Sequence, residues 1–559
     1  MWYFTNADKL SDIFTFWHIV GYFAISVVNA LLLLLISYKF LQIMQQSGYE
    51  GFGYFKWLRK RDNIYLRRLG TVSTLSLLGF LLFNIAFAFA DGAWIFYIGF
   101  IFYIGFSFNY FLADRKRKKK IPIVFTSRMN RLITVYFFLL LIITFALLTL
   151  LNIMAFNLKA NTLLVRVRFS PVCLMPMLVP VFVLLAYYIT KPFEIVRQEK
   201  YIEKCTKKLK EHKDLIKIGI TGSYGKTSVK RILCTILEEK YSVLATPSSY
   251  NTPMGICKSV KRLKPEHQVF IAEMGARHVG DIRKLAKIVE PNFAIINGIV
   301  GQHLESFGSL SAIKQTKYEL VESMPSGCVA YTVDSENTLS LFDDCKLKTI
   351  KAGINLIENP TVFAKEISMN ENGTTFILSI HEKEIKCHTA LLGKHNISNI
   401  CLAVAIAYEM GLSIFEISAG ISRLTAVEHR LNVKKSANGI TIIDDSYNCN
   451  PKGIDAALEV LSFFDGRKIV ITPGMVELGS TEDTENYLLG KKLATACDIA
   501  VLVGRSSAYI IRNGLLECGF NPENIIQAST LDGAMKKLQQ LLKAGDVILF
   551  ENDLPDKFA

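Results

Sequence analysis

The sequence feature that most constrains the fold is a series of long apolar runs confined to the first third of the chain. A helix needs about 20 mainly apolar residues to cross a bilayer. Only Asp91 and Gly92 separate the second run from the third, which suits a tight hairpin. We predict an α-helical membrane domain of about five spans over residues 1–193, with buried core helices as the alternative. The five runs are Trp17–Ser37, Thr71–Ala90, Ala93–Leu112, Leu132–Leu151 and Pro171–Thr190.

The formal net charge of +15 is concentrated in the same region. Residues 1–200 carry 22 Lys and Arg against 8 Asp and Glu, a net of +14, whereas the remainder carries 42 against 41, a net of +1. The basic excess therefore accompanies the apolar runs, and it gives no indication of nucleic-acid binding.

The distribution of this charge predicts the orientation of the spans, because basic loops stay in the cytoplasm. Seven basic residues lie between the first two runs, and eight lie between Arg115 and Arg131. With five spans, the N-terminus is outside and everything after Lys191 is cytoplasmic, in a multi-pass protein of the bacterial cytoplasmic membrane. The basic run at 115–120 also suits contact with the headgroups of the lipid bilayer.

From residue 194 onward the sequence has the pattern of a soluble α/β protein. Residues 194–214 are predicted to form a charged helical connector. Across 215–428, strand-like and helix-like stretches alternate, which predicts a parallel sheet with helices on both faces. Within it, 361–393 is two-periodic and predicts antiparallel strands with a turn at Asn372-Gly373. Alternation resumes over 429–559 and predicts a smaller, Rossmann-like C-terminal domain.

A phosphate-binding site is predicted at KIGITGSYGKTSVKRIL (Lys217–Leu233), which has the order strand, glycine turn, helix. Its spacing departs from the usual P-loop G-x-x-x-x-G-K-[ST], because Ile220 stands where the first glycine should be. Backbone N–H groups at a helix N-terminus favour an anion. Lys226 can neutralise phosphate charge, and Thr227 can bind Mg²⁺. A chance strand–turn–helix is the alternative.

Three further polar residues belong to the strands and helix that come next. Glu273 stands at the C-terminal end of a predicted buried strand, where ligands of open α/β sheets bind. A carboxylate there is a natural Mg²⁺ ligand, although a helix-capping acid is an equal alternative. His303 follows the next strand, and Lys317 lies on the helix after it. Taken alone, such a histidine is more often structural.

Seven motifs occur along the chain in a fixed order, and together they resemble the Mur ligases. Within that family the resemblance is greatest to the branch that adds D-alanyl-D-alanine to the muramyl tripeptide. It extends from about Ile216 to Asp546. The Mur P-loop has the shorter form G-x-x-G-K-[ST], which accounts for the unusual spacing. The motifs are TGSYGKTS, TPSSYNTPMGI (Thr246–Ile256), AEMGARHVGDI (Ala272–Ile282), HLESFGS (His303–Ser309), GKHNISN (Gly393–Asn399), DDSYNCNP (Asp444–Pro451) and PGMVELG (Pro473–Gly479).

The resemblance implies an ATP-dependent carboxylate–amine ligase that forms ADP and phosphate through an acyl phosphate, with ATP and two Mg²⁺ ions as cofactors. It implies Lys226, Lys317 and His303 as catalytic residues, with Lys317 where several members carry a carbamylated lysine. Thr227, Glu273 and His303 would hold metal. The residues implied to bind the nucleotide are Gly222, Ser223, Tyr224, Gly225, Lys226, Thr227, Ser228, His395, Asn399, Arg430, Asp445, Tyr447 and Asn448.

The sequence departs from the family pattern in three places. The membrane region stands where the family has its UDP-substrate domain. VEHR precedes the C-terminal domain where this branch has a glycine before the arginine, and FENDLPDKF (Phe550–Phe558) replaces a KGSR-type stretch. The ATP chemistry is thus better supported than the identity of either substrate.

We expect a membrane-anchored ligase that joins an amino acid or dipeptide to a lipid-linked or nucleotide-linked precursor of the cell wall or another surface polymer. A synthetase of the poly-γ-glutamate type is the alternative within ligases. A P-loop transporter ATPase is a further alternative, although no LSGGQ-like signature occurs.

Overall fold

The computed structural model describes residues 16–59, 63–87, 98–115, 122–158, 162–301, 307–427, 429–446, 451–476, 478, 481–504 and 506–552. The chain divides into two compact units, one extending to Arg197 and the other beginning at Gln198. Each unit is described here by itself.

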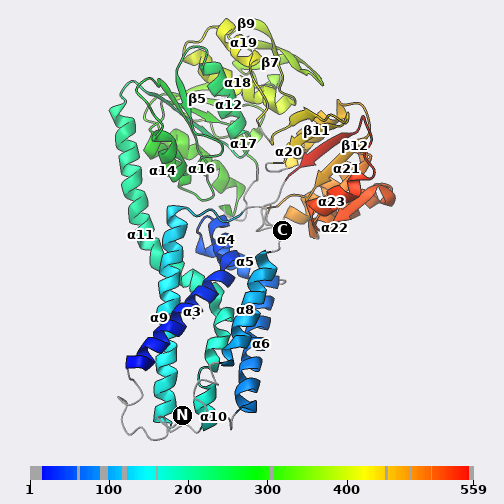
Figure 1. Ribbon diagram of the computed structural model, residues 1–559. Coiled ribbons are helices and arrows are strands. Elements are labelled where there is room, and N and C mark those ends of the chain that lie inside the picture. The colour runs from blue at the N-terminus through cyan, green and yellow to red at the C-terminus, as the bar shows by residue number, and fades with distance from the viewer. Residues whose placement is uncertain are drawn as a thin grey trace. The chain divides into compact units, whose positions relative to one another are not determined.

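All regular elements in the described residues of the first unit are helices (Figure 1). Helix α3 packs against α9 and α8, and α6 packs against α8. The buried Leu33, Tyr136 and Leu140 belong to its largest core. Its elements are α3 (Phe16–Ile36), α4 (Tyr38–Gln46), α5 (Gly51–Leu58), α6 (Ile64–Ala86), α8 (Phe100–Arg115), α9 (Ser127–Asn157), α10 (Thr162–Val167), η1 (Ser170–Leu174) and α11 (Met175–Glu211), which continues into the second unit.

Four helical stretches within the described residues are long and apolar enough to cross a membrane: α3, α6, α9 and the stretch Leu163–Glu211 that contains α11. The run predicted at Ala93–Leu112 corresponds to α8, which covers Phe100–Arg115 and has 16 residues. The predicted hairpin at Asp91-Gly92 lies outside the described residues.

Many apolar side chains are exposed on the outside of these helices, and hydrogen-bonded polar side chains lie within the largely apolar interior. Ile142 is 61% exposed and Leu82 is 66% exposed. In the interior, Asn29 donates to Thr144 Oγ1 at 2.9 Å and accepts from Tyr103 Oη at 2.6 Å. The exposed surface differs from that of a soluble helical domain, which places charged and polar side chains outside.

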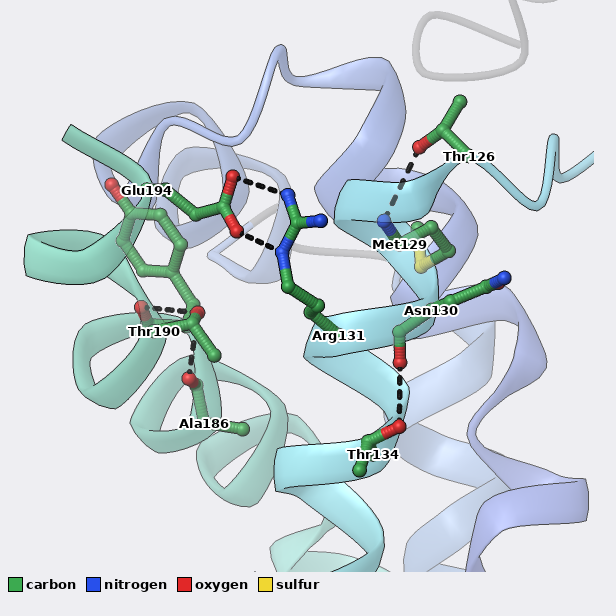
Figure 2. A network of polar contacts seen from close by, with 9 residues as sticks. Thr126, Met129, Asn130, Arg131, Thr134, Ala186, Thr190 and Glu194 are labelled. Atoms are coloured by element: carbon green, nitrogen blue, oxygen red, sulfur yellow. Dashed lines mark hydrogen bonds and ion pairs between the residues drawn. The ribbon is translucent and has the colours of Figure 1, made fainter. Parts of the chain in front are cut away.

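The last predicted apolar run and the predicted helical connector form one continuous helix, because α11 passes through Pro192 and ends at Glu211. Proline removes an N–H donor and often ends a helix. Here contacts on both sides of the proline stabilise the helical path (Figure 2). Thr190 Oγ1 donates to the carbonyl oxygens of Ala186 and Tyr187 at 3.0 Å. On the next turn, Glu194 accepts two hydrogen bonds from the Arg131 guanidinium of α9, at 2.5 and 2.8 Å.

The second unit begins with the end of α11 and contains two sheets (Figure 1). The larger has nine strands in the order β2-β3-β1-β4-β5-β6-β7-β8-β9. The strands from β2 to β7 pair in parallel, and β7, β8 and β9 pair antiparallel, as the two-periodic section predicted. They are β1 (Ile216–Thr221), β2 (Val243–Ala245), β3 (Val269–Glu273), β4 (Phe293–Ile296), β5 (Cys328–Thr332), β6 (Lys348–Gly353), β7 (Val362–Asn370), β8 (Gly373–Ile380) and β9 (Lys383–Thr389).

Helices cover both faces of this sheet, because alternate strand residues point to opposite sides. Ile218 and Ile220 of β1 pack in one core with α12 (Lys226–Leu237), α18 (Lys394–Glu409) and α19 (Ile414–Ser422). Phe270 and Ala272 of β3 pack in the other core with the end of α11, α13 (Pro253–Val260), α14 (Asp281–Val289) and α16 (Leu310–Glu322). The short α17 (Glu336–Leu339) and η2 (Leu356–Glu358) flank β5 and β6.

The second sheet has the order β10-β11-β15-β12-β13-β14, parallel except for the β10–β11 pair. Its five parallel strands alternate with helices, as predicted, and β10 is an additional antiparallel strand at the edge. Helices α20, α21 and α22 lie in one core and α23 in the other. The elements are β10 (Asn432–Lys435), β11 (Thr441–Asp445), α20 (Pro451–Ser462), β12 (Lys468–Thr472), α21 (Glu482–Ala496), β13 (Ile499–Val503), α22 (Ser506–Glu517), η4 (Pro522–Asn524), β14 (Ile525–Ala528), α23 (Leu531–Gln539) and β15 (Val547–Glu551).

Candidate active site

The predicted phosphate loop lies between β1, a central strand of the larger sheet, and α12. Gly225 is the N-cap of α12 and has a left-handed backbone with φ +71°. A Cβ on Gly225 would approach Asn297 Nδ2 to 2.2 Å, so glycine is required by space as well as by conformation. Ser223 N–H donates to the carbonyl of Gly298 at 2.9 Å, which fixes the loop against the segment after β4. The first N–H groups of α12 are thereby presented to an anion.

Thr227 and Glu273, predicted as metal ligands, are brought together because β1 pairs with β3. Thr227 Oγ1 donates to Glu273 Oε2 at 3.0 Å. The Glu273 carboxylate is buried, and Asn251 Nδ2 donates to its Oε1 at 3.2 Å. Lys230 Nζ donates to Oε2 at 2.8 Å as a buried ion pair. A carboxylate and a hydroxyl are the hard oxygen ligands that suit Mg²⁺, and Mg²⁺ commonly completes its shell with water and substrate phosphate.

This donor set is small. Among the described residues, no group of three or more His, Cys, Asp or Glu side chains is placed to hold a metal ion. Such a site fits an ion that arrives with nucleotide phosphates, and it does not fit a structural metal bound by protein alone. His303, the third predicted metal ligand, lies outside the described residues.

Two lysines at the site have depressed pKa values. Lys226 is half-buried, and its Nζ donates to the carbonyls of Gly222 and Ser223 at 2.7 and 3.1 Å. Burial lowers the pKa of Lys226 to about 8, although Glu273 opposes the shift. Lys317 on α16 is buried, with its Nζ 5.9 Å from the centre of the Phe307 ring. Burial, with a smaller effect of the nearby Lys226 charge, lowers the pKa of Lys317 to about 7.

A cavity of about 310 Å³ adjoins the phosphate loop. Seven of the predicted nucleotide residues line it, and they come from the phosphate loop and α12, from α18, and from the segments around β10 and β11: Tyr224, Gly225, Ser228, His395, Asn399, Arg430 and Asp445. The cavity therefore draws on both sheets' domains, and its volume is within the range of small-molecule sites.

Two residues that line the cavity, His395 and Asp445, have shifted pKa values. Burial lowers the pKa of His395 to about 4, so its ring is neutral at pH 7. Its Nδ1 is buried and makes no hydrogen bond within the described part of the chain, which leaves it for a ligand. Burial raises the pKa of Asp445 to about 6, while the Leu431 N–H and the Arg430 charge oppose the shift. Leu431 N–H donates to Asp445 Oδ1 at 3.2 Å.

Three residues that sequence reasoning missed support the site. Asn297, which follows β4, donates from Nδ2 to Asn399 Oδ1 at 2.8 Å and accepts from Gly298 N–H at 2.7 Å. Asp334, which follows β5, accepts from the N–H of Asn355 at 2.8 Å and from the Ser398 hydroxyl. Both occupy the carboxyl end of a parallel strand, the same signal that singled out Glu273. Lys230, the third, lies one helical turn after Lys226.

The structure thus groups the predicted residues around the loop and the cavity. Tyr447 and Asn448 lie outside the described residues, as does His303. Gly222 and Ser223, predicted to bind the nucleotide, lie in the loop between β1 and α12, which has the expected strand–turn–helix form.

Comparison with known proteins agrees with this geometry. Residues 220–407 match the Mur ligase middle domain, and residues 429–551 match the domain described as Mur ligase, glutamate ligase domain. The UDP-N-acetylmuramoyl-tripeptide–D-alanyl-D-alanine ligase of Mycobacterium tuberculosis is 30% identical over 355 residues, which cover 59% of this chain and 69% of the relative. The chain belongs to the Mur ligase family. It is therefore an ATP-dependent carboxylate–amine ligase, and its cofactors are ATP and Mg²⁺.

Other relatives and solved structures share the fold of this Mur ligase. The corresponding ligase of Bacillus subtilis is 26% identical over 337 residues, covering 60% of this chain and 72% of the relative. A crystal structure of MurF from Acinetobacter baumannii superposes with a TM-score of 0.59 at 28% identity, covering 65% of this chain and 78% of that one. MurF from Thermotoga maritima, solved in complex with ADP, gives 0.56 at 25% identity, covering 64% and 80%. Family membership leaves the transporter alternative without support.

Proposed function

We propose that the protein is a membrane-anchored Mur ligase that activates an acceptor carboxylate as an acyl phosphate and joins an amine to it. The observation that carries the ligase chemistry is the cluster of Lys226, Thr227 and Glu273 beside the cavity of about 310 Å³. The observation that supports membrane anchoring is the first unit, whose long apolar helices expose many apolar side chains.

The proposed roles follow from the positions of the residues. Lys226 would leave the loop carbonyls that it now contacts and neutralise phosphate charge, together with the N–H groups at the start of α12. Thr227 and Glu273 would hold Mg²⁺, with His303 at a second ion. Mg²⁺, when bound, would neutralise the phosphate oxygens during transfer of the phosphoryl group.

Lys317 is the proposed site of carbamylation. An amine must be neutral to attack carbon dioxide, and a pKa of about 7 leaves a large neutral fraction at physiological pH. The product would be an anion close to Lys226, whose positive charge already destabilises the cationic form of Lys317. Carbamylation would thus replace a repulsive interaction with an attractive one.

The cavity is the proposed site of the nucleoside. His395 and Asn399 on α18 would contact the base, while Arg430 and Asp445 would reach the nucleotide from the C-terminal side. Tyr447 and Asn448 would complete that side. Catalysis would require the two sides to close around ATP, because its ligands come from both.

The acceptor is proposed to be lipid-linked. The relatives named above act, by their names, on a UDP-linked tripeptide and D-alanyl-D-alanine. In this chain, residues 1–193 would instead form a membrane domain, followed by a connector over 194–214, an ATP-binding domain over 215–428 and a C-terminal domain over 429–559. An acceptor held at the bilayer surface would need no soluble nucleotide carrier. The incoming group would be an amino acid or a dipeptide.

The test compares the full chain with Lys226→Ala, each reconstituted in lipid vesicles with ATP, Mg²⁺, amino acids and an extract of precursors. Mass spectrometry of the lipid-linked and nucleotide-linked fractions should show one added residue or dipeptide on a lipid-linked precursor with the wild type only. Addition to the nucleotide-linked fraction alone would contradict the lipid-linked acceptor. A ladder of repeated additions would favour the poly-γ-glutamate type, and equal product with Lys226→Ala would contradict the ligase site.

A further inference from the structure

The ion pair between Lys230 and Glu273 is the strongest feature of the site that the proposed roles leave unused. The Lys230 side chain is 6% exposed and that of Glu273 is 2% exposed. Thr227 Oγ1 and Lys230 Nζ both donate to the same oxygen, Glu273 Oε2, at 3.0 and 2.8 Å. A carboxylate oxygen can accept two hydrogen bonds, so the lysine can remain in place when the hydroxyl turns toward a metal.

Lys230 also connects the carboxylate to a neighbouring loop. Its Nζ donates to the carbonyl oxygen of Ser248, whose backbone is left-handed with φ +44°. The same loop supplies Thr246 Oγ1, which accepts from Glu273 N–H at 3.1 Å, and Asn251 Nδ2, which donates to Glu273 Oε1. The loop after β2 and the carboxylate at the end of β3 are therefore held as one assembly through both carboxylate oxygens.

The charges at this point do not favour a free cation. Glu273 contributes one negative charge, and Lys230 neutralises it at 2.8 Å. Lys226, on the same helix, adds a further positive charge close enough for Glu273 to raise its pKa. A divalent ion would thus meet no net negative charge from these side chains until phosphate oxygens are also present.

We propose that Lys230 is a positioning residue that fixes Glu273 for the metal and makes metal binding depend on bound nucleotide. This rests on the proposed assignment of Thr227 and Glu273 to Mg²⁺. The metal then enters the site together with ATP, and the site does not fill with free ions between turnovers.

The test measures Mn²⁺ binding, by electron paramagnetic resonance, to the full chain in detergent micelles, with and without ADP. Wild type, Lys230→Met, Lys230→Gln and Lys230→Arg are compared, with Lys287→Met, on the exposed side of α14, as a matched control. Wild type, Lys230→Arg and Lys287→Met should bind Mn²⁺ tightly only with ADP. Lys230→Met and Lys230→Gln should bind Mn²⁺ without nucleotide at least 10-fold more tightly than wild type, and their turnover should fall.

Unchanged nucleotide-free Mn²⁺ affinity in Lys230→Met or Lys230→Gln would overturn the proposal. Lys230→Gln provides the test if Lys230→Met does not fold, because glutamine removes the charge and keeps an N–H donor on a side chain one bond shorter. Glu273→Gln separates this proposal from the metal assignment on which it rests. If Glu273→Gln binds Mn²⁺ with ADP as tightly as wild type, the assignment itself fails, whatever the lysine variants show.

Discussion

Replacement of Asn297 by alanine should destabilise the second unit and weaken nucleotide binding together. Asn297 is buried and joins the segment after β4 to α18 by donating to Asn399 Oδ1 at 2.8 Å. Its own Oδ1 accepts from Gly298 N–H at 2.7 Å. Alanine would leave one acceptor and one donor without these partners.

The size of the effect follows from those two groups. A buried polar group left unsatisfied costs about 1–3 kcal/mol. Asn399 borders the cavity, so water can partly replace its lost donor, whereas the hydrogen bond of Gly298 N–H is buried. We therefore expect Asn297→Ala to lower the free energy of unfolding by about 2–4 kcal/mol. Asn399→Ala should lower it less, and the double variant should lose less than the sum, because both remove the same hydrogen bond.

The assay is pulse proteolysis of the full chain in micelles across a urea series, combined with titration of a fluorescent ADP analogue. Tryptophan fluorescence does not serve here, because all four tryptophans of the chain lie within its first 94 residues. Asn438→Ala, in an exposed turn, is the matched control. If Asn297→Ala has the urea midpoint and analogue affinity of the control, the Asn297–Asn399 pair does not support the site.

Three further changes test other parts of the structure. Burial lowers the pKa of Lys317 to about 7 from 10.5, so the folded chain loses this proton at a lower pH than the unfolded chain does, and stability against urea should rise between about pH 7 and 10.5. Lys317→Met should remove that rise. A pH profile of stability that is the same in Lys317→Met as in the wild type would contradict the prediction. Gly225→Ala would place an alanine in a left-handed backbone conformation, which costs about 1–2 kcal/mol, and would bring its Cβ to 2.2 Å from Asn297 Nδ2. The variant should not bind the ADP analogue. Retained binding would contradict the loop geometry. Arg131→Met should lower the thermal midpoint of the first unit in micelles, because Glu194 loses its bidentate partner. Adding Glu194→Gln should restore most of the loss. Equal midpoints for the single and double variants would show that the Arg131–Glu194 pair does not stabilise the unit.

The predictions that succeeded depended on patterns local to the chain. The alternation of strands and helices, the antiparallel strands at 361–393 and the strand–turn–helix of the phosphate loop each follow from the periodicity of a short segment. Asn297 and Asp334 show that the same reasoning could have gone further, because all three lie at the C-terminal end of a strand: Glu273 is the last residue of β3, Asn297 follows β4 directly, and Asp334 lies two residues after β5.

Continuous helix across Pro192 was not predictable in this way. Proline favours a helix end, and two kinds of contact oppose it. The two hydrogen bonds from Arg131 to Glu194 join residues 63 positions apart, and Thr190 donates to backbone carbonyls of the preceding turn. A rule that considers the proline alone contains neither effect.

By itself, the sequence determined that the first third is apolar and basic, that the rest is α/β, and which loop would receive phosphate. Only the tertiary structure decided which side chains meet there. Thr227 and Glu273 are 46 residues apart, and Asn297 and Asn399 are 102 apart. The first pair meets because the sheet order sets β1 beside β3, and the second because α18 packs on the sheet face that carries α12. Strand order and helix packing minimise the free energy of the whole unit, so no single segment specifies them.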